Sequence, residues 1–326
     1  MSSTAQLVSD EAVLMLSTAE AAEIDQVARH LVTVSDRIDD AWVSAARSAW
    51  ETLPIAFRRR VREFRRDSGS GGSLVVRGLL VDNEHLPPTP SVGGSVQQVA
   101  TAPAALLLMT ACGLGDPTAF LAEKSGALVQ DVVPVPGQEE FQGNAGSVDL
   151  MMHNENAFHP HRPDYVLLLC LRPDHEQIAG LRAASVRQAL PLLSAETREA
   201  LSRPEFSTQA PPSFGTAGGV VPNHAVLTGD VTDPDVRVDF AATTGLTPAA
   251  RGALVSLATA LDEVSRTVRL VAGDLAIVDN RICLHGRTSF KPRYDGQDRW
   301  VQRIFAVTDL RRSRHRRPSD GYVLAR

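Results

Sequence analysis

Residues 152–159 read Met-His-Asn-Glu-Asn-Ala-Phe-His, and residues 279–287 read Asp-Asn-Arg-Ile-Cys-Leu-His-Gly-Arg. In an extended backbone, side chains two residues apart project to the same face, so His153 and Glu155 can point at a single ion. With His285 they would form a 2-His-1-carboxylate triad, which binds Fe(II) and leaves three coordination positions open. The HExxH spacing that zinc hydrolases present on a helix is absent. A chain with nine histidines can contain His-x-Glu by chance, so a purely structural role for the pair stays open.

Two arginines follow in a segment, residues 298–306, whose composition predicts a strand. Arg299 and Arg303 are four residues apart, which puts both on one face of a strand. Burying two guanidinium groups is unfavourable without anions, and each can pair bidentately with a carboxylate. The pattern therefore predicts a site for two carboxylate ligands. The alternative, that both arginines form surface ion pairs, is disfavoured by the apolar Val301 and Phe305 between and beside them.

The composition is that of a soluble globular protein. The 326 residues are 43% hydrophobic and 22% charged, with a formal net charge of −5. This charge offers no broad cationic surface for nucleic acid or an acidic membrane, so a small-molecule partner is expected, and no pattern specifies an oligomeric state. Three widely spaced cysteines predict neither a disulfide framework nor a cysteine zinc site. No stretch resembles a secretory signal or a membrane span, which favours a cytoplasmic location.

Helical and strand-like patterns alternate within what we interpret as one domain, residues 1–326. We expect a helical N-terminal region (1–66), a β-rich core with inserted helices (73–308) and a basic tail (309–326). Apolar spacing predicts helices in three places: two amphipathic helices within 18–64, a buried helix over 96–112, and a helix over 247–264 with Thr247 as its cap.

Short runs rich in strand formers predict an antiparallel sheet structure. The predicted strands are residues 74–81, 127–133, 165–171, 183–186, 268–271, 275–279 and 300–307. The Ser-Gly run 68–73 is expected to be a flexible connector. Two basic runs, 58–66 and 311–317, are interpreted as a helix end and a chain end that face solvent, rather than as anion or nucleic-acid sites.

Several motifs together resemble one known group of enzymes. In chain order they are Glu123-Lys-Ser-Gly126, His153-x-Glu155-x-Ala-Phe-His159, Pro163-Asp-Tyr-Val166, Asp174-His-Glu176, Ala184-Ser-Val-Arg187, Gly273-Asp-Leu-Ala-Ile-Val-Asp-Asn280, His285-Gly-Arg287 and Arg293-Tyr-Asp-Gly-Gln-Asp-Arg-Trp300. The chain resembles the clavaminate synthase-like group of Fe(II)/2-oxoglutarate oxygenases, relatives of taurine dioxygenase that include arginine, asparagine and lysine hydroxylases. The resemblance implies an α+β fold whose core is a double-stranded β-helix, or jelly roll, with flanking helices.

The resemblance also implies a cofactor and two cosubstrates. It assigns Fe(II) to His153, Glu155 and His285, and it makes 2-oxoglutarate and O2 the cosubstrates. Arg299 matches the position that binds the distal carboxylate of 2-oxoglutarate. Decarboxylation of 2-oxoglutarate to succinate and CO2 would then accompany removal of a hydrogen atom from the substrate and transfer of a hydroxyl group to it.

For the substrate, the resemblance implies three contacts. Arg303 would bind the α-carboxylate of an amino acid, Glu123 its α-ammonium group, and Asp239 its side chain. Asp239 belongs to a loop that also carries Asp230, Asp233 and Asp235. An acidic lid would suit a cationic side chain such as that of lysine or arginine, although an exposed acidic loop without a binding role is an equal alternative.

One position departs from the group's pattern. Leu181 stands where several members have a threonine that hydrogen-bonds the cosubstrate, which puts the detailed pose of 2-oxoglutarate in doubt. His159 and His161 lie near the predicted triad in sequence but match no ligand, so loop or supporting roles are expected. His224 could line the mouth of a pocket.

Together these patterns lead to the hypothesis that the chain hydroxylates a free, basic L-amino acid, lysine or arginine, at the β or γ carbon in specialised metabolism. An oxidative cyclase or desaturase of the clavaminate synthase type is one alternative. A hydroxylase of a carrier-tethered amino acid is another. A jelly-roll module that binds a metal or ligand without turnover is the alternative from a different class.

Overall fold

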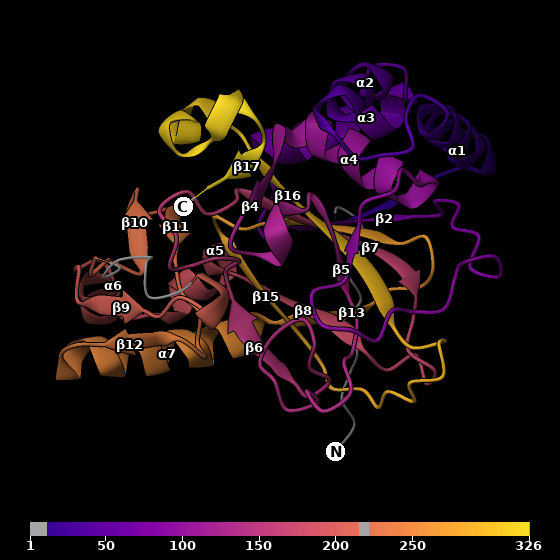
Figure 1. The fold of residues 1–326 in the computed structure, drawn as a ribbon. Helices are drawn as coiled ribbons and strands as arrows, with labels where there is room; N and C mark the ends of the chain where they lie inside the picture. The colour runs from indigo at the N-terminus through magenta and orange to yellow at the C-terminus, as the bar shows by residue number, and fades with distance from the viewer. Residues whose placement is uncertain (1–11, 215–221, 326) are drawn as a thin grey trace.

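The computed structural model describes residues 12–214 and 222–325, and most of their strands lie in two sheets (Figure 1). The larger sheet has the order β1 (Val13–Met15), β2 (Ser73–Arg77), β14 (Leu275–Asp279), β7 (Tyr165–Arg172), β16 (Trp300–Val307), β4 (Asp116–Phe120) and β17 (Val323–Leu324). β5 (Val129–Val132) also pairs with β16, and β3 (Val96–Gln97) pairs with β5. The smaller sheet has the order β13 (Arg266–Arg269), β8 (Gly180–Ser185), β15 (Cys283–Arg287) and β6 (Leu150–His153).

Consecutive strands of the core alternate between the two sheets. β6 and β8 lie in the smaller sheet with β7 between them in the larger one, and β13 to β16 repeat the same alternation. Their inner faces share one buried apolar cluster, which includes Val166 and Ala276 from the larger sheet and Ala184 and Leu284 from the smaller. β6 and β15 therefore both border this shared interior.

Four helices cover the outer face of the larger sheet (Figure 1). They are α1 (Thr18–Val32), α2 (Asp40–Trp50), α3 (Ile55–Arg66) and α4 (Ala102–Leu114). Trp42 and Leu107 from these helices join Leu167 and Ile277 from the sheet in a second buried cluster. Because β7 and β14 are covered on both faces, their sequences are continuously apolar rather than alternating.

The remaining elements flank the smaller sheet or connect the strands. α5 (Val186–Ala189), α6 (Ala195–Leu201) and α7 (Pro248–Val264) lie on its side of the molecule, together with two short antiparallel strand pairs (Figure 1). These pairs are β9 (Phe206–Thr208) with β12 (Thr243–Gly245), and β10 (Leu227–Gly229) with β11 (Pro234–Val236). The mixed helix and sheet content agrees with the predicted class.

The N-terminal region differs from the prediction in its helix boundaries. Three helices, not two, span residues 18–66, because Asp39 caps α2 and Pro54 precedes α3. A short strand, β1, was also missed. The buried helix predicted over 96–112 begins only at Ala102, where the Thr101 side chain accepts from the Ala104 N–H. The helix predicted over 247–264 and the strands predicted over 275–279 and 300–307 are confirmed.

Both ends of the connector 68–73 are packed against the core, which its composition did not indicate. Ser68 is buried and donates to the Asp279 carboxylate at 2.7 Å. Gly72 has a φ of +64°, and a Cβ atom there would lie 2.8 Å from the Cys283 Cβ, whereas one at Gly69 or Gly71 would meet nothing within 4 Å. Gly72 therefore serves close packing, which a sequence reading for linkers does not distinguish from flexibility.

Most basic side chains of the tail face solvent, as expected, although the tail is folded. Residues 310–316 form a 3-10 helix, whose exposed members include Arg312, Arg314 and Arg316, and β17 pairs in parallel with β4. Arg317 is the exception, because it is buried and donates to the carbonyl groups of Leu310 and Asp320 and to the Asp320 carboxylate.

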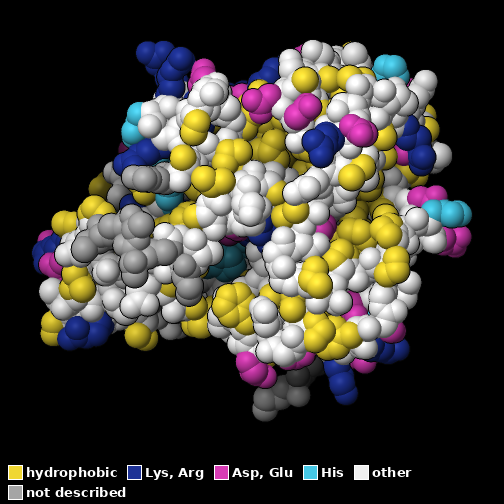
Figure 2. All heavy atoms as spheres, in the orientation of Figure 1, with side chains coloured by type: hydrophobic (Ala, Val, Ile, Leu, Met, Phe, Trp, Pro, Cys, Tyr) yellow, Lys and Arg dark blue, Asp and Glu magenta, His cyan; other side chains and the backbone are white. Residues whose placement is uncertain are grey.

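Two further observations concern membrane-spanning helices and the distribution of surface charge. No helix in residues 12–214 or 222–325 is long and apolar enough to cross a membrane. Basic and acidic side chains are interspersed on the face in Figure 2, without a broad area of one sign.

Gly113 in α4 gives a test of the packing between helices. A Cβ atom at Gly113 would lie 2.4 Å from a Trp50 ring carbon, whereas one at Gly252 in α7 would meet nothing within 4 Å. Overpacking costs about 1–3 kcal/mol, so Gly113→Ala should lower the free energy of unfolding by that amount in urea titrations. The matched helical variant Gly252→Ala should raise it by roughly 0.4–1 kcal/mol. Equal effects of the two substitutions would contradict this packing.

Candidate metal centre

Three side chains that are distant in sequence converge at one mouth of the two sheets. His153 ends β6, and the antiparallel register of β6 and β15 places it directly opposite His285. The two imidazole rings are 4.5 Å apart between centroids. Glu155 lies two residues beyond β6, and its Oε2 is 3.8 Å from His285 Nε2. One potential ligand atom from each of the three lies within 4.8 Å of the others, so the predicted cluster exists.

Local contacts orient the first two members of this cluster. His153 Nδ1 lies 2.9 Å from the Met151 carbonyl oxygen, so this nitrogen carries the proton and Nε2 is left as a free lone pair. The chain turns sharply after Glu155, because Asn156 has a φ of +51°. The turn takes the next residues out of the strand direction while Glu155 stays on the side of the histidines.

The donor set fits a ferrous ion. Two imidazoles and one carboxylate on one side of an ion are the ligands of a facial triad with open positions. Burial, assisted by the nearby His153 and Arg303, lowers the pKa of His285 well below its usual value, which keeps the imidazole neutral as a metal ligand requires. His285 Nδ1 is buried without a hydrogen-bond partner among the described residues, so no hydrogen bond of this nitrogen to them would compete with a metal ion for the ring.

A buried arginine links the cluster to a second carboxylate. Arg303 of β16 donates to Glu155 Oε2 at 2.8 Å, to Gln130 Oε1 at 2.5 Å and to Glu123 Oε1. Burial alone would lower its pKa, but the charges of Glu155 and Glu123 outweigh burial and raise it. Burial and the same guanidinium lower the pKa of Lys124 to about 8. One fixed cation thus pairs with two carboxylates that face the same space.

These groups line a cavity of about 620 Å³. Among the polar side chains of its walls are Glu123, Asn144, His153, Glu155, Asp239 and Arg303. The cavity is large enough for a small metabolite beside a metal ion. The structure therefore brings three of the predicted substrate contacts together with two members of the triad.

Arg299 immediately precedes β16, the strand that carries Arg303, and it lies outside the lining of this cavity. Val301 and Phe305 belong to the cluster between the sheets, which confirms that alternate residues of β16 face inward. Within residues 12–214 and 222–325, Arg299 has no hydrogen bond or ion pair, and its only ring contact is Phe290 at 5.8 Å. Burial lowers its pKa. The alternative of surface ion pairs is wrong for both arginines, because Arg303 pairs with buried carboxylates and Arg299 pairs with none of the described residues.

The acidic loop divides into one residue at the cavity and three that lie elsewhere. Asp239 forms a bridge pair with His153 and lines the cavity. Asp233 instead forms an ion pair with Arg187, and Asp230 accepts from Thr232. Asp230, Asp233 and Asp235 do not line the cavity, so the acidic lid expected over a cationic side chain is not formed by them.

The other singled-out residues take supporting places. His159 Nδ1 accepts from the His161 N–H at 3.0 Å, and neither histidine joins the triad. His224 is buried against Thr208 at 2.8 Å and does not line the cavity mouth. Leu181 pairs with Arg287 across β8 and β15, two residues from the partner of His285, so the substituted position does face the site.

Two residues that contact Arg303 were missed from the sequence. Gln130 lies opposite Arg303 in the register of β5 and β16. With its amide oxygen turned to the arginine, Asn144 accepts from the guanidinium at 3.1 and 3.3 Å. No spacing pattern marks either one, because both depend on pairing between segments far apart in the chain.

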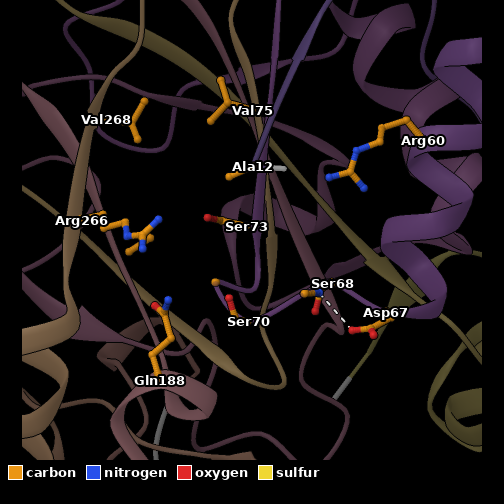
Figure 3. A pocket seen from close by; sticks show the side chains of 13 residues that line it. Ala12, Arg60, Asp67, Ser68, Ser70, Ser73, Val75, Gln188, Arg266 and Val268 are labelled. Carbon is orange, nitrogen blue, oxygen red and sulfur yellow. Dashed lines mark hydrogen bonds between the residues drawn. The ribbon is translucent and has the colours of Figure 1, made fainter. Parts of the chain in front are cut away.

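Two other features differ from this centre. His175, Asp295 and Asp298 also lie together, but the two ring nitrogens of His175 face different carboxylates, at 3.0 and 3.8 Å, rather than a common point. A separate cavity of about 350 Å³ lies where Arg60 of α3 and Arg266 of β13 face each other (Figure 3). The described residues that line it include no histidine.

Comparison with known proteins gives four similarities. Residues 97–305 match the model of the "Taurine catabolism dioxygenase TauD, TfdA family". The chain is 60% identical to the L-asparagine oxygenase of Streptomyces coelicolor over 95% of this chain and 93% of that protein. It is 36% identical to clavaminate synthase 2 of Streptomyces clavuligerus over 83% of each. A crystal structure of asparagine oxygenase with Fe(II), 2S,3S-3-hydroxyasparagine and succinate superposes with a TM-score of 0.94 at 58% identity, covering 97% of this chain and 99% of that one.

Metal binding at the cluster can be tested by spectroscopy. Anaerobic protein with Fe(II) and 2-oxoglutarate should develop a weak visible charge-transfer absorption, and His153→Ala or His285→Ala should abolish it because each removes one of three ligands. His85→Ala is the matched control, since the side chain of His85 is 81% exposed. Retention of the absorption in both ligand variants would contradict the assignment.

Proposed function

We propose that this chain, which belongs to the TauD, TfdA family of dioxygenases, hydroxylates a free L-amino acid and that this amino acid is L-asparagine. The chain is a non-haem iron dioxygenase that uses Fe(II), 2-oxoglutarate and O2. A binding module without turnover is therefore set aside. The proposal concerns the substrate and the roles of individual residues.

For the fold, we propose a single domain with a double-stranded β-helix core. Its support is the alternation of successive strands, β6 to β8 and β13 to β16, between two facing sheets that share one apolar interior. Such an arrangement opens at the strand ends, where ligands from β6 and β15 meet.

His153, Glu155 and His285 are proposed to hold the iron. Their support is the convergence of three suitable ligand atoms, the neutral state of His285 and the free Nε2 of His153. When bound, the iron supplies the oxidative chemistry of 2-oxoglutarate decarboxylation and C–H hydroxylation. The chain itself contributes the ligands, the positions of both organic molecules and the exclusion of water.

Arg299 is proposed to bind the distal carboxylate of 2-oxoglutarate. It is a partly buried guanidinium that pairs with no carboxylate among the described residues, and a ligand anion would supply the missing partner. Arg287, whose pKa burial and Arg299 lower to about 9, adds a second positive group nearby. Leu181 provides apolar contact in place of a hydrogen bond, so charge carries more of the binding.

Arg303 and Glu123 are proposed to bind the backbone of the amino acid. They pair directly with each other in the cavity, and a zwitterion can insert between them with its carboxylate on Arg303 and its ammonium on Glu123. This exchange keeps every charge balanced, which matters because an unpaired charge in a buried site is costly. Asn144 and Gln130 hold the guanidinium in place.

Asp239 is proposed to accept from the substrate's side chain. A carboxylate in a lining that also carries amide side chains suits the NH2 group of a carboxamide, and a chain at 60% identity is named for oxygenating L-asparagine. Lysine and arginine remain the alternative, because Asp239 would also accept from a cationic side chain. Asp230, Asp233 and Asp235 give no support to a substrate with a cationic side chain, since they lie away from the cavity.

The substrate is tested with a panel of free amino acids. L-asparagine should give the fastest succinate formation and a product heavier by one oxygen atom. Faster reaction of lysine or arginine would favour the basic alternative, and a product lighter by two hydrogen atoms would indicate a desaturase or cyclase. If only carrier-tethered asparagine reacted, the tethered form rather than the free amino acid would be the substrate.

The cosubstrate role of Arg299 is tested by Arg299→Lys. A point charge cannot reproduce the bidentate contact, and loss of a charged hydrogen bond costs about 1.5–3 kcal/mol, so the KM for 2-oxoglutarate should rise roughly 10- to 100-fold. The KM for the amino acid should change little. Arg269→Lys on the exposed edge of β13 is the control. An unchanged KM for 2-oxoglutarate would remove Arg299 from this role.

A further inference from the structure

The fully buried side-chain amide of Asn280 forms hydrogen bonds with both backbone polar groups of Glu155. Asn280 follows β14, has no exposed surface and lies five residues before His285. Its Oδ1 accepts from the Glu155 N–H at 2.7 Å, and its Nδ2 donates to the Glu155 carbonyl at 3.1 Å and to the Pro163 carbonyl at 2.8 Å. One planar side chain therefore satisfies both the donor and the acceptor of Glu155.

Glu155 needs such a partner because no strand holds it. β6 ends at His153, and the positive φ of Asn156 turns the chain immediately after Glu155. A backbone outside a sheet has no ladder to fix its direction, and buried peptide groups must still be paired. Asn280 performs the function of a missing neighbouring strand for this one residue.

Asn154 extends the same contact to two other segments. Its Oδ1 accepts from the Val238 N–H at 3.0 Å, next to Asp239. Its Nδ2 donates to the carbonyl groups of Asn280 at 2.9 Å and of Cys283 at 3.3 Å. The two amides thus join the turn of Glu155, the approach to His285 and the segment that carries Asp239.

Asn280 is itself fixed from behind. Its N–H donates to the Asp164 carbonyl at 2.8 Å. The preceding Asp279 accepts from Ser68 at 2.7 Å and pairs with Arg281 at 2.7 Å. Asn280, which holds the backbone of Glu155, is therefore itself held by contacts to the connector 68–73 and to neighbouring segments of the sheet.

We propose that Asn280 is a positioning residue of the metal centre, which sets the carboxylate of Glu155 against the two histidines and, through Asn154, aligns Asp239 with them. Asn280 does not line the cavity, so it acts only through Glu155 and Asn154. This inference rests on the proposed assignment of His153, Glu155 and His285 as iron ligands.

The test is Asn280→Asp. Aspartate has nearly the same shape and still accepts from the Glu155 N–H, but its second oxygen would face the Glu155 and Pro163 carbonyls without a proton to donate. Changes behind a metal ligand typically cost about 10- to 100-fold in metal affinity, so the dissociation constant for Co(II), read from its visible absorption in the metal-free protein, should rise by that factor. In the iron enzyme, succinate should exceed hydroxylated product, because a misplaced substrate no longer reacts each time 2-oxoglutarate is consumed.

Thr110→Ala is the matched control. Thr110 is buried and donates to the Leu106 carbonyl at 2.8 Å within α4, remote from the cavity. It should lower the melting temperature while leaving the Co(II) dissociation constant within about twofold of native, because loss of a buried hydrogen bond destabilises without moving the ligands. Asn154→Ala is the second variant, and it carries the same expectation if Asn280→Asp does not fold.

The outcomes separate this inference from the assignment of the triad. Loss of Co(II) binding in His153→Ala together with native affinity and a native succinate-to-product ratio in the folded asparagine variants would overturn the positioning role alone. Native Co(II) binding in His153→Ala would overturn the assignment of the ligands. A weakening in Thr110→Ala equal to that in Asn280→Asp would also overturn the positioning role, because the effect would then follow stability.

Discussion

The register between β6 and β15 is the constraint on which the rest of the centre depends. It puts His153 opposite His285, and a slip by one residue would turn one imidazole to the other face of the sheet. Strand pairing fixes only these two of the proposed iron ligands. The third, Glu155, lies beyond the end of β6, where the buried side-chain amide of Asn280 hydrogen-bonds its backbone in place of a neighbouring strand. The centre thus combines two proposed ligands held by a sheet with one held by a side chain.

Charge balance is the second constraint, and it connects the metal centre with the substrate cavity. Arg303 lies between Glu155 and Glu123, so the cation that compensates a proposed iron ligand also faces the proposed position of the amino acid. In a buried site, each ionised group needs a partner in every state. A zwitterionic substrate that separates Arg303 from Glu123 meets that requirement, because it offers each of them a new partner of opposite charge, which makes amino acids a natural class of ligand for this arrangement.

The layered fold explains why these groups can stay buried. Helices α1 to α4 cover the outer face of the larger sheet, and β7 and β14 are apolar on both faces. At the mouth between the sheets the buried Arg303 pairs with the carboxylates of Glu123 and Glu155. Rigid strands carry most of the ligands, and the connector 68–73, despite its glycines, supports the loop that contains Asn280 from behind.

The sequence by itself determined the local elements and the identity of the chemical groups. Strand and helix patterns located β14, β16 and α7 closely, and the His-x-Glu pair with the distant His285 predicted the triad, because alternation and ligand chemistry are local properties. It did not indicate that Arg317 is buried or that Gly72 packs against Cys283, because arginine and glycine each have more than one structural use. Only the tertiary structure decided that three loop acids lie away from the cavity, that Gln130 and Asn144 contact Arg303, and that Asn280 holds Glu155, since these contacts join segments up to 173 residues apart. Their pairing depends on sheet register, which no short stretch of sequence encodes.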